Sequence, residues 1–458
     1  MSIGRSANRM RRTRGFSPAM RKFGRRHFLK AVGGVSALAA FGATVAFEGP
    51  RRRGPVRVAL IGAGAQGEVL CNSLDPFVAQ LAAVCDIRPS TKATAEQQQG
   101  VKWYQDWRQM LNDGSIEAVM IATPLCTHAE IAAGCLDAGK HVFCETGIAQ
   151  DAAGCERLIA AAQRSGRILH IGYQHYYEPL YWAAFNNIMR QNLLGDVFAI
   201  EACCPTSHSE RVPVNPDDAG FDPRPWGYAS LDQLMNWRLY RRYSAGPMGE
   251  WGGRVISLIN WFLGGPPTAV QATGGIYTYK DDRDVNDHVF VTLEYPYSRT
   301  TTLSLIPSNG FVQPYMQIMG KKGTLILSEG ESLLFMEDQD NSTQLSTAPV
   351  GGTQSIMDAS ASRRAEGANH STLAQGAVAG QAGNTAAFQN EIVAFCGSIR
   401  AGAPLRGSLS DARNVTLGCL AIDKAIERQT RVMTQLHAKM DRHALFDQDE
   451  RQTAYARS

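Results

Sequence analysis

The chain has 458 residues, a hydrophobic content of 44% and a charged content of 19%. These values predict an ordinary globular protein of about two or three domains. The net charge of +4 does not indicate nucleic-acid binding, because the first 53 residues hold thirteen of the lysines and arginines and only one acidic residue, which leaves the remainder acidic.

The first 53 residues are predicted to be a twin-arginine signal and linker that lie outside the fold. Arg25 and Arg26 precede a mildly apolar stretch from Ala31 to Phe47. This stretch is too short for a comfortable membrane span of about 20 apolar residues. We expect the twin-arginine machinery to export the folded protein to the periplasm or cell exterior, with membrane anchoring if the signal stays uncleaved. A basic tail with a chance apolar run is the alternative.

The next stretch predicts a dinucleotide-binding βα unit. An apolar run from Val56 to Ile61 is followed by Gly62-Ala63-Gly64-Ala65-Gln66-Gly67, and helical apolar spacing begins after it. A second apolar run ends at Asp86. A GxGxxG pattern alone is a weak signal, but a strand before it, a helix after it and an acid some twenty residues on are specific. A glycine-rich turn without a ligand is the alternative.

Each residue type in this unit has a chemical reason. Gly62 permits the tight turn, Gly64 admits the pyrophosphate and Gly67 allows close packing of helix on strand. The helix N-terminus attracts phosphates. The carboxylate of Asp86 accepts hydrogen bonds from the adenine ribose and repels a 2′-phosphate, which favours NAD. Arg88, after Ile87, leaves NADP possible.

Alternating strands and helices continue to residue 172. Apolar runs at 118–122, 141–144 and 168–172 predict strands of one parallel, doubly wound sheet. Ligands bind at the carboxyl ends of such strands. The candidate cofactor residues that follow the strands are Thr123, Pro124, His128, Glu145 and Gln174. We therefore predict a Rossmann domain at 54–172.

Residues 173–431 are predicted to form a second α/β domain with an open, mostly antiparallel sheet. Period-two apolar patterns recur at 197–204, 270–276, 288–295, 300–306, 315–319 and 324–328. Residues 345–385 are rich in Gly, Ala and Ser and predict a surface excursion with little structure. Closing helices are expected at 388–400 and 411–428, and 432–458 is expected to be a polar tail.

These stretches together resemble the Gfo/Idh/MocA family of oxidoreductases, from about residue 56 to residue 431. The resemblance rests on VRVALIGAGAQG, AVCDIRP, VMIATPLCTHAEIAAGCLDAGKHVFCETG, GPMGEWGGRVISLINWFLGG and MGKKGTLILSEG, in that order. It implies a Rossmann domain, a C-terminal α/β domain, tightly bound NAD(P), sugar-like substrates and a homodimer or homotetramer.

The chain departs from the family pattern where the family places its acid–base groups. The usual Glu-Lys-Pro reads Glu145-Thr146-Gly147, and the Asp and His of Asp-x-Gly-x-His-x-x-Asp read Glu250 and Arg254. A threonine hydroxyl is no base near neutral pH, and arginine stays protonated. The resemblance therefore implies an atypical site, with Thr146 and Arg254 at the altered positions.

Glu250 is the carboxylate that survives at this site. It is expected to act as a base or substrate clamp, with Arg254 four residues on to hold a substrate anion. A helix N-terminal acid in an intrahelical ion pair is an equal alternative. Tyr240 and His175 are further candidates, although packing roles are as compatible with the sequence.

Three functions remain open from the sequence. The first is an exported NAD(P)-dependent oxidoreductase of a carbohydrate or cyclitol. The second is a redox-assisted glycosidase or lyase that regenerates its NAD, and the third is a nucleotide- or sugar-binding protein without chemistry. Aromatics and arginines between Arg224 and Trp251 suit a saccharide or uronate, or an interdomain core. No clustered Cys/His pattern predicts a metal site.

Overall fold

The computed structural model describes residues 54–205, 211–306, 314–328, 331–337, 344–347, 379–434 and 436. The predicted twin-arginine signal and most of the predicted excursion lie outside these ranges. In the described part, no helix combines the length and the apolar character needed to cross a membrane.

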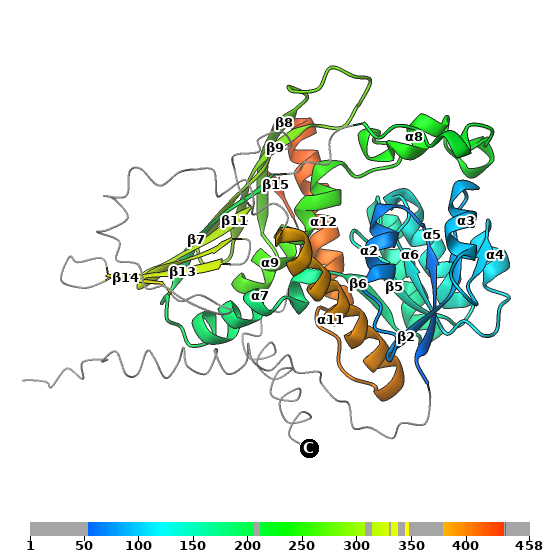
Figure 1. Ribbon diagram of the computed structural model, residues 1–458. Helices are drawn as coiled ribbons and strands as arrows, with labels where there is room; N and C mark the ends of the chain where they lie inside the picture. The colour runs from blue at the N-terminus through cyan, green and yellow to red at the C-terminus, as the bar shows by residue number, and fades with distance from the viewer. Residues whose placement is uncertain are drawn as a thin grey trace, which may run out of the picture.

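The N-terminal domain is a six-stranded parallel sheet with helices on its faces (Figure 1). The strand order is β3-β2-β1-β4-β5-β6, so β1 and β4 lie at the centre, where the chain direction across the sheet reverses. The strands are β1 (Val56–Ile61), β2 (Ala79–Cys85), β3 (Lys102–Tyr104), β4 (Ala118–Ile121), β5 (His141–Glu145) and β6 (Leu169–Gly172). The helices are α2 (Ala65–Asn72), α3 (Ser90–Glu96), α4 (Trp107–Met110), α5 (Leu125–Asp137) and α6 (Ala152–Ser165).

Local signals explain where these elements begin and end. All four residues of β4 are buried, as expected for a strand covered on both faces. Helix α6 begins where the Asp151 side chain accepts a hydrogen bond from the Gly154 amide, and it ends at Gly166 in the left-handed conformation. The predicted doubly wound Rossmann sheet is thus confirmed.

The second domain carries a nine-stranded sheet in the order β14-β13-β12-β11-β7-β10-β9-β8-β15. Its strands are β7 (Val197–Pro205), β8 (Ala269–Gly275), β9 (His288–Tyr295), β10 (Arg299–Ile306), β11 (Tyr315–Gly320), β12 (Gly323–Ser328), β13 (Glu331–Met336), β14 (Gln344–Thr347) and β15 (Val432–Met433). The pairings are antiparallel except between β7 and β10, which are parallel. This matches the predicted mostly antiparallel sheet, with β7 inserted into its middle.

The boundaries differ from the sequence prediction at two places. Residues 344–347 form β14 and residues 379–385 open α11, so both ends of the predicted excursion are structured. The expected tail begins with β15, which pairs with β8 and completes the edge of the sheet. Both strands are too short to show a period-two pattern, and long-range pairing determines them.

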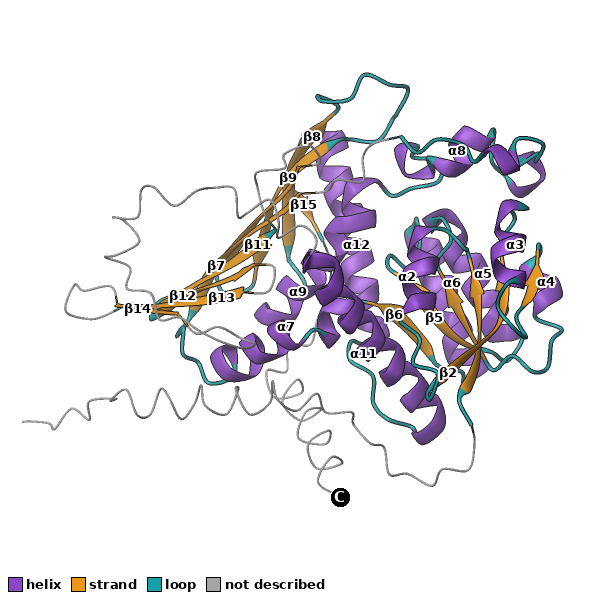
Figure 2. Ribbon diagram, viewed as in Figure 1, coloured by secondary structure: helices purple, strands orange, loops and turns teal. Residues whose placement is uncertain are grey.

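Helices cover one side of the nine-stranded sheet (Figure 2). They comprise η1 (Gln174–Tyr177), α7 (Pro179–Ala184), η2 (Phe185–Met189), α9 (Gly253–Leu263) and α12 (Leu409–Arg428). Helix α12 contacts β8, α9 and α6 and so joins the two domains. A second late helix, α11 (Ala379–Ala401), packs on the Rossmann sheet, where Phe388, Ile392 and Phe395 share one core with Leu60 and Phe143.

Residues 211–247, which we call the bridging segment, cross from the second domain to the Rossmann domain. The segment contains η3 (Pro216–Asp218), η4 (Arg224–Trp226), α8 (Leu231–Met235) and η5 (Trp237–Leu239). Its aromatic core, built on Tyr228, Tyr240 and Tyr243, packs against Ile87 and Cys126 of the Rossmann domain. The segment therefore lies over the carboxyl edge of the parallel strands.

Candidate functional site

The glycine-rich turn has the geometry that a dinucleotide requires. Gly62 has φ +95°, and a Cβ there would lie 2.6 Å from the Ala122 carbonyl oxygen. A Cβ on Gly67 would lie 2.1 Å from the Gly62 carbonyl oxygen. Around Gly64, by contrast, a Cβ would meet no atom within 4 Å, so its backbone faces open space. Gly62 thus allows the turn, Gly67 allows the helix to pack closely, and Gly64 leaves room for close approach of a ligand.

Asp86 lies at the end of β2 and holds this turn in place. Its Oδ2 accepts a hydrogen bond of 2.7 Å from the Ala63 amide. Its other partner is Arg88, whose amide and guanidinium donate to Asp86 Oδ1 at 2.8 and 3.2 Å. Arg88 also donates to the Ala63 carbonyl oxygen at 3.2 Å. The carboxylate of Asp86, which favours NAD, and the guanidinium of Arg88, which would accept the 2′-phosphate of NADP, therefore lie next to each other at the turn.

His128 of α5 connects two strand ends without facing the turn. Its Nε2 lies 2.8 Å from the Thr123 carbonyl oxygen after β4, and its Nδ1 lies 2.8 Å from the Gly147 carbonyl oxygen after β5. The ring is 3% exposed, and burial lowers its pKa while the two carbonyl contacts raise it. His128, predicted to bind the cofactor, therefore positions the loops that begin at Thr123-Pro124 and Glu145.

Glu145 ends β5 and joins the turn to the second domain. Its Oε1 accepts a 2.7 Å hydrogen bond from Gln66 of the turn, and its Oε2 lies 3.6 Å from Nη2 of Arg254 on α9. Burial raises the pKa of Glu145, and the charge of Arg254 opposes the rise. The predicted cofactor residue Glu145 and the predicted anion-binding residue Arg254 are thus brought together.

Glu250 lies beside this pair with partners of its own. Its Oε1 accepts a 3.0 Å hydrogen bond from the Ser244 hydroxyl, and its Oε2 lies 3.5 Å from Arg238 Nε. Burial raises the pKa of Glu250 to about 6, although Arg238, Ser244 and Arg254 oppose the rise. A carboxylate with a pKa near neutrality can accept or return a proton under ordinary conditions.

The intrahelical pair between Glu250 and Arg254, which the alternative interpretation predicted, is not formed, because each residue has another partner. Glu250 belongs to the π-helical segment η6 (Met248–Gly252), and Arg254 belongs to the α-helix that follows it. A π-turn has more residues than an α-turn, so residues four apart no longer lie directly above one another. The change of helix type turns Glu250 toward Arg238 and Arg254 toward Glu145.

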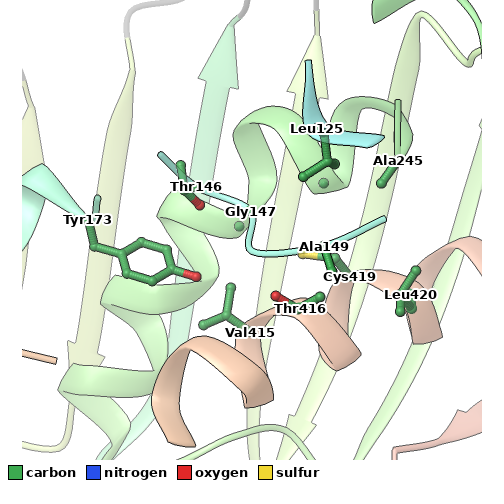
Figure 3. A pocket seen from close by; sticks show the side chains of 12 residues that line it. Leu125, Thr146, Gly147, Ala149, Tyr173, Ala245, Val415, Thr416, Cys419 and Leu420 are labelled. Atoms are coloured by element: carbon green, nitrogen blue, oxygen red, sulfur yellow. The ribbon is translucent and has the colours of Figure 1, made fainter. Parts of the chain in front are cut away.

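Thr146 lies in the lining of a small cavity (Figure 3). Its hydroxyl and that of Tyr173 face a cavity of about 10 Å³, which Thr416 and Cys419 of α12 also line. Such a volume is close to that needed for one water molecule. Both hydroxyls are buried and have no hydrogen-bond partner among the described residues. Thr146, a predicted catalytic-site residue, therefore faces α12 across this cavity with an uncharged side chain.

Two predicted catalytic candidates have other surroundings. The Tyr240 hydroxyl is held in the bridging segment by Asp282 at 3.0 Å and by Arg211 at 3.2 Å. His175 lies 3.5 Å from Glu178, and its ring contacts that of Tyr181. Both side chains thus have partners other than Glu250, Arg254 and Glu145. Gln174, next to His175, is 2% exposed, and its Oε1 lacks a partner among the described residues.

The structure adds site residues that the sequence did not single out. Arg238 and Ser244 come from the bridging segment, where no motif marks them. Glu391 of α11 and His170 of β6 form a fully buried pair at 3.0 Å, beneath Glu145. Burial raises the pKa of Glu391 well above its usual value and lowers that of His170 to about 3. The two residues are 221 positions apart in the sequence, so sequence reasoning could not predict this contact.

The residues at this edge fit a dinucleotide. The open backbone at Gly64 and the uncapped N-terminus of α2 would hold the pyrophosphate, and Asp86 with Arg88 would meet the adenine ribose. Gln174 presents an unpaired acceptor near the other end. In the described ranges no three His, Cys, Asp or Glu side chains gather as metal ligands. All ten cysteines are free thiols.

Comparison with known proteins agrees with this geometry. A model described as the oxidoreductase family with an NAD-binding Rossmann fold, GFO/IDH/MocA, matches residues 56–173. A model of the GFO/IDH/MocA C-terminal domain matches residues 182–326. Together the two models cover more than half of the chain.

Similar individual proteins include inositol dehydrogenases. Inositol 2-dehydrogenase of Salmonella typhimurium is 34% identical over 119 residues, which are 25% of this chain and 35% of that protein. Inositol 2-dehydrogenase/D-chiro-inositol 3-dehydrogenase of Lactiplantibacillus plantarum is 35% identical over 130 residues, or 27% and 37% of the two chains. The matches thus span little more than a third of these curated relatives.

Solved structures share the fold over a greater length. Levoglucosan dehydrogenase in complex with NADH and L-sorbose superposes with a TM-score of 0.64 at 18% identity, over 84% of this chain and 100% of that chain. The WlbA dehydrogenase of Bordetella pertussis, in complex with NADH and UDP-GlcNAcA, gives a TM-score of 0.62 at 15% identity, over 83% and 97%. On its sequence motifs, its two domains and the family models, this chain belongs to the Gfo/Idh/MocA family of NAD-binding oxidoreductases.

Proposed function

We propose that the protein is an exported NAD-dependent oxidoreductase that acts on a carbohydrate or cyclitol hydroxyl. Glu250 carries this proposal, since it is a buried carboxylate with a pKa of about 6 at the carboxyl edge of an NAD-binding sheet. The inositol and levoglucosan dehydrogenases among the similar proteins support the substrate class. NADP remains the second cofactor that Arg88 would accommodate.

The proposed reaction is the oxidation of a secondary alcohol. The C–H bond of the carbinol gives its hydride to the nicotinamide, and the O–H proton passes to the carboxylate of Glu250, which leaves a ketone. NAD supplies the hydride acceptor when it is bound. Ser244 and Arg238 orient the Glu250 carboxylate, and Arg254 lies beside Glu145.

The assay follows nicotinamide absorbance with a panel of neutral and acidic sugars and cyclitols. We expect slow turnover of glucose and inositol, because the lysine and histidine of the family are absent. General acid–base assistance is commonly worth about 10²–10⁴ in rate. Fast oxidation of glucose, unchanged in Glu250→Gln, would overturn the assignment of the base.

A redox-assisted glycosidase or lyase is a second candidate, and the bridging segment favours it. Asp218 of that segment is 1% exposed and holds Ser90, at the start of α3, through hydrogen bonds of 2.9 and 2.7 Å. A cofactor retained beneath this segment suits a cycle in which NAD is reduced and reoxidised. Chromatography would detect any product. Product formed without net NADH would favour this candidate, and absence of any turnover would favour a binding protein.

We also propose export through the twin-arginine pathway, supported by Arg25 and Arg26 before an apolar stretch. Replacing both with lysine should leave a folded protein in the cytoplasm. Fractionation followed by immunoblotting measures this, and unchanged export of the double variant would rule out the pathway.

The protein is further proposed to pair through the uncovered side of the nine-stranded sheet. The side chain of Phe290 on β9 is 46% exposed there, between the buried Val289 and Val291. Light scattering would measure the oligomeric state of the parent and of Phe290→Glu, in which the dimer or tetramer should be weakened. A monomeric parent would contradict the proposed pairing.

A further inference from the structure

Two guanidinium groups at the site are poorly paired within the protein. Arg238 Nε lies 3.5 Å from Glu250, and Arg254 Nη2 lies 3.6 Å from Glu145. Both separations exceed those of ordinary charge-assisted hydrogen bonds. In addition, Nε of Arg254 is buried and has no partner among the described residues. Neither arginine therefore forms a close charge-assisted hydrogen bond with its neighbouring carboxylate, and Arg254 keeps one buried donor without a partner among the described residues.

Arginines elsewhere in the described chain form much closer pairs. Arg400 donates two hydrogen bonds to Glu117, at 2.6 and 2.7 Å. Arg283 donates to both oxygens of Asp281, also at 2.6 and 2.7 Å. Two-pronged contacts of this kind are the arrangement that guanidinium and carboxylate prefer. Arg238 and Arg254 lack such a contact, as does Arg241, whose Nη1 lies 3.5 Å from Glu427.

Both arginines are reachable and close enough to influence each other. Their side chains are 42% and 24% exposed. The guanidinium of Arg238 lies over the Trp237 ring at 4.2 Å, which fixes its plane. The pKa of Arg238 is lowered by its enclosure in the protein and further by the charge of Arg254, although Glu250 opposes this. An anion placed between the two guanidinium groups would relieve their repulsion.

We propose that the substrate is a carboxylated sugar whose carboxylate binds between Arg238 and Arg254. This rests on the proposed function, because it places a ring hydroxyl next to Glu250. The charges of the two arginines, Glu145 and Glu250 sum to zero, so a monoanion is accommodated better than a phosphate dianion, which would face both carboxylates. A carboxylate also matches the planar donor fork of arginine.

The test measures binding, so it does not depend on turnover. Calorimetry at neutral pH uses the purified full chain saturated with NADH, with D-glucuronate, D-galacturonate, the neutral methyl ester of each, and D-glucose as probes. At least one uronate should bind about tenfold or more tightly than its methyl ester, which is a difference of about 1.4 kcal/mol.

Variants locate the carboxylate. Arg254→Gln and Arg238→Gln should each weaken uronate binding about tenfold or more while leaving methyl-ester binding unchanged. Arg254→Lys should retain part of the affinity for uronate, because lysine keeps the positive charge. The rest should be lost, because lysine lacks the two parallel donors of a guanidinium group. Arg224→Gln is the matched control, since Arg224 lies in the same bridging segment but pairs with exposed Asp222. Retained NADH binding shows that each variant is folded.

The outcomes separate this proposal from the proposed function. Uronate binding that needs both arginines, without NADH formation from NAD, would support the carboxylate site and overturn the oxidoreductase assignment. Uronates that bind no more tightly than their methyl esters, or equally in the parent and the arginine variants, would overturn the carboxylate site, whatever the enzyme oxidises.

Discussion

Glu250 shows how the surroundings of a single carboxylate can bring its pKa toward neutrality. Its carboxylate is enclosed by protein, accepts one hydrogen bond from Ser244 and has one loosely held cation in Arg238. Burial favours the protonated form and the cations favour the ionised form, so the pKa settles near 6. A carboxylate in this range can take up a proton at neutral pH and release it afterwards.

The first prediction concerns the pH dependence of Glu250. The raised pKa means that the carboxylate is protonated, and unable to accept a proton, below about pH 6. We expect kcat/KM to rise with pH through about 6 and then level off. Glu250→Gln should lower kcat by about 10²–10⁴ and abolish this rise. Glu178→Gln is a control away from the site, and an unchanged profile in Glu250→Gln would assign the pKa to another group.

The second prediction concerns Asp86, which holds both the glycine-rich turn and Arg88. Asp86→Ala should weaken NAD binding by about 1.5–3 kcal/mol, because it removes an ionised acceptor. It should also reduce discrimination against NADP, since Arg88 loses its intramolecular partner and can meet a 2′-phosphate. Calorimetry with both nucleotides measures this, with Asp222→Ala as an exposed control. Equal NAD affinity in parent and variant would mean that Asp86 does not contact the ribose.

At the scale of elements, the bridging segment acts at both ends of the cofactor edge. Asp218 holds the start of α3 beside Asp86, and Arg238 reaches Glu250 about twenty residues later. A nucleotide between the segment and the sheet can leave only if some of these contacts open. The segment thus connects the proposed cofactor site to the surroundings of Glu250.

The third prediction tests this link through Asp218→Asn. An amide cannot accept both hydrogen bonds from Ser90, so the segment should open more often. The dissociation rate of NADH should rise about fivefold to tenfold, as expected for loss of about 1 kcal/mol. Stopped-flow fluorescence measures this rate, and Asp222→Asn, in the same segment, serves as the control. An unchanged rate would show that the segment does not limit release.

Sequence reasoning located the elements whose signals are local. The period-two pattern placed β9 at its observed bounds, and the glycine spacing placed the cofactor turn. It did not find the π-helical turn at Glu250, because nothing in MGEWG distinguishes it from an α-helix. Nor did it find the partners of Glu250 and Glu145, since these depend on how the bridging segment and α9 pack on the Rossmann domain. Propensity and spacing fix elements, whereas tertiary packing fixes which side chains meet.

At the scale of the whole molecule, the two domains share their cores. Helix α11, from the C-terminal part of the chain, covers Val58, Leu60 and Phe143 of the Rossmann sheet. Arg400 of the same helix pairs with Glu117, beside β4, at 2.6 Å. Residues 54–172 alone therefore do not complete the core of the Rossmann domain.

The fourth prediction follows from this shared core. A fragment of residues 54–172 should expose the apolar face that α11 covers, so it should aggregate or bind a hydrophobic dye and melt without a cooperative transition. Scanning calorimetry and light scattering measure this, with the chain from residue 54 onward as the control. A monomeric fragment with a sharp transition would show that α11 is dispensable.

The position of α11 also sets an order of events during synthesis. Its Arg400 contacts a residue 283 positions earlier, so the core of the first domain cannot be completed until α11 has been synthesised. Contacts this distant in sequence form late and slowly. Until then the apolar surface of Phe143 and Leu60 stays open to chaperones. The nascent chain would therefore complete its nucleotide-binding domain only after α11 has closed over the sheet.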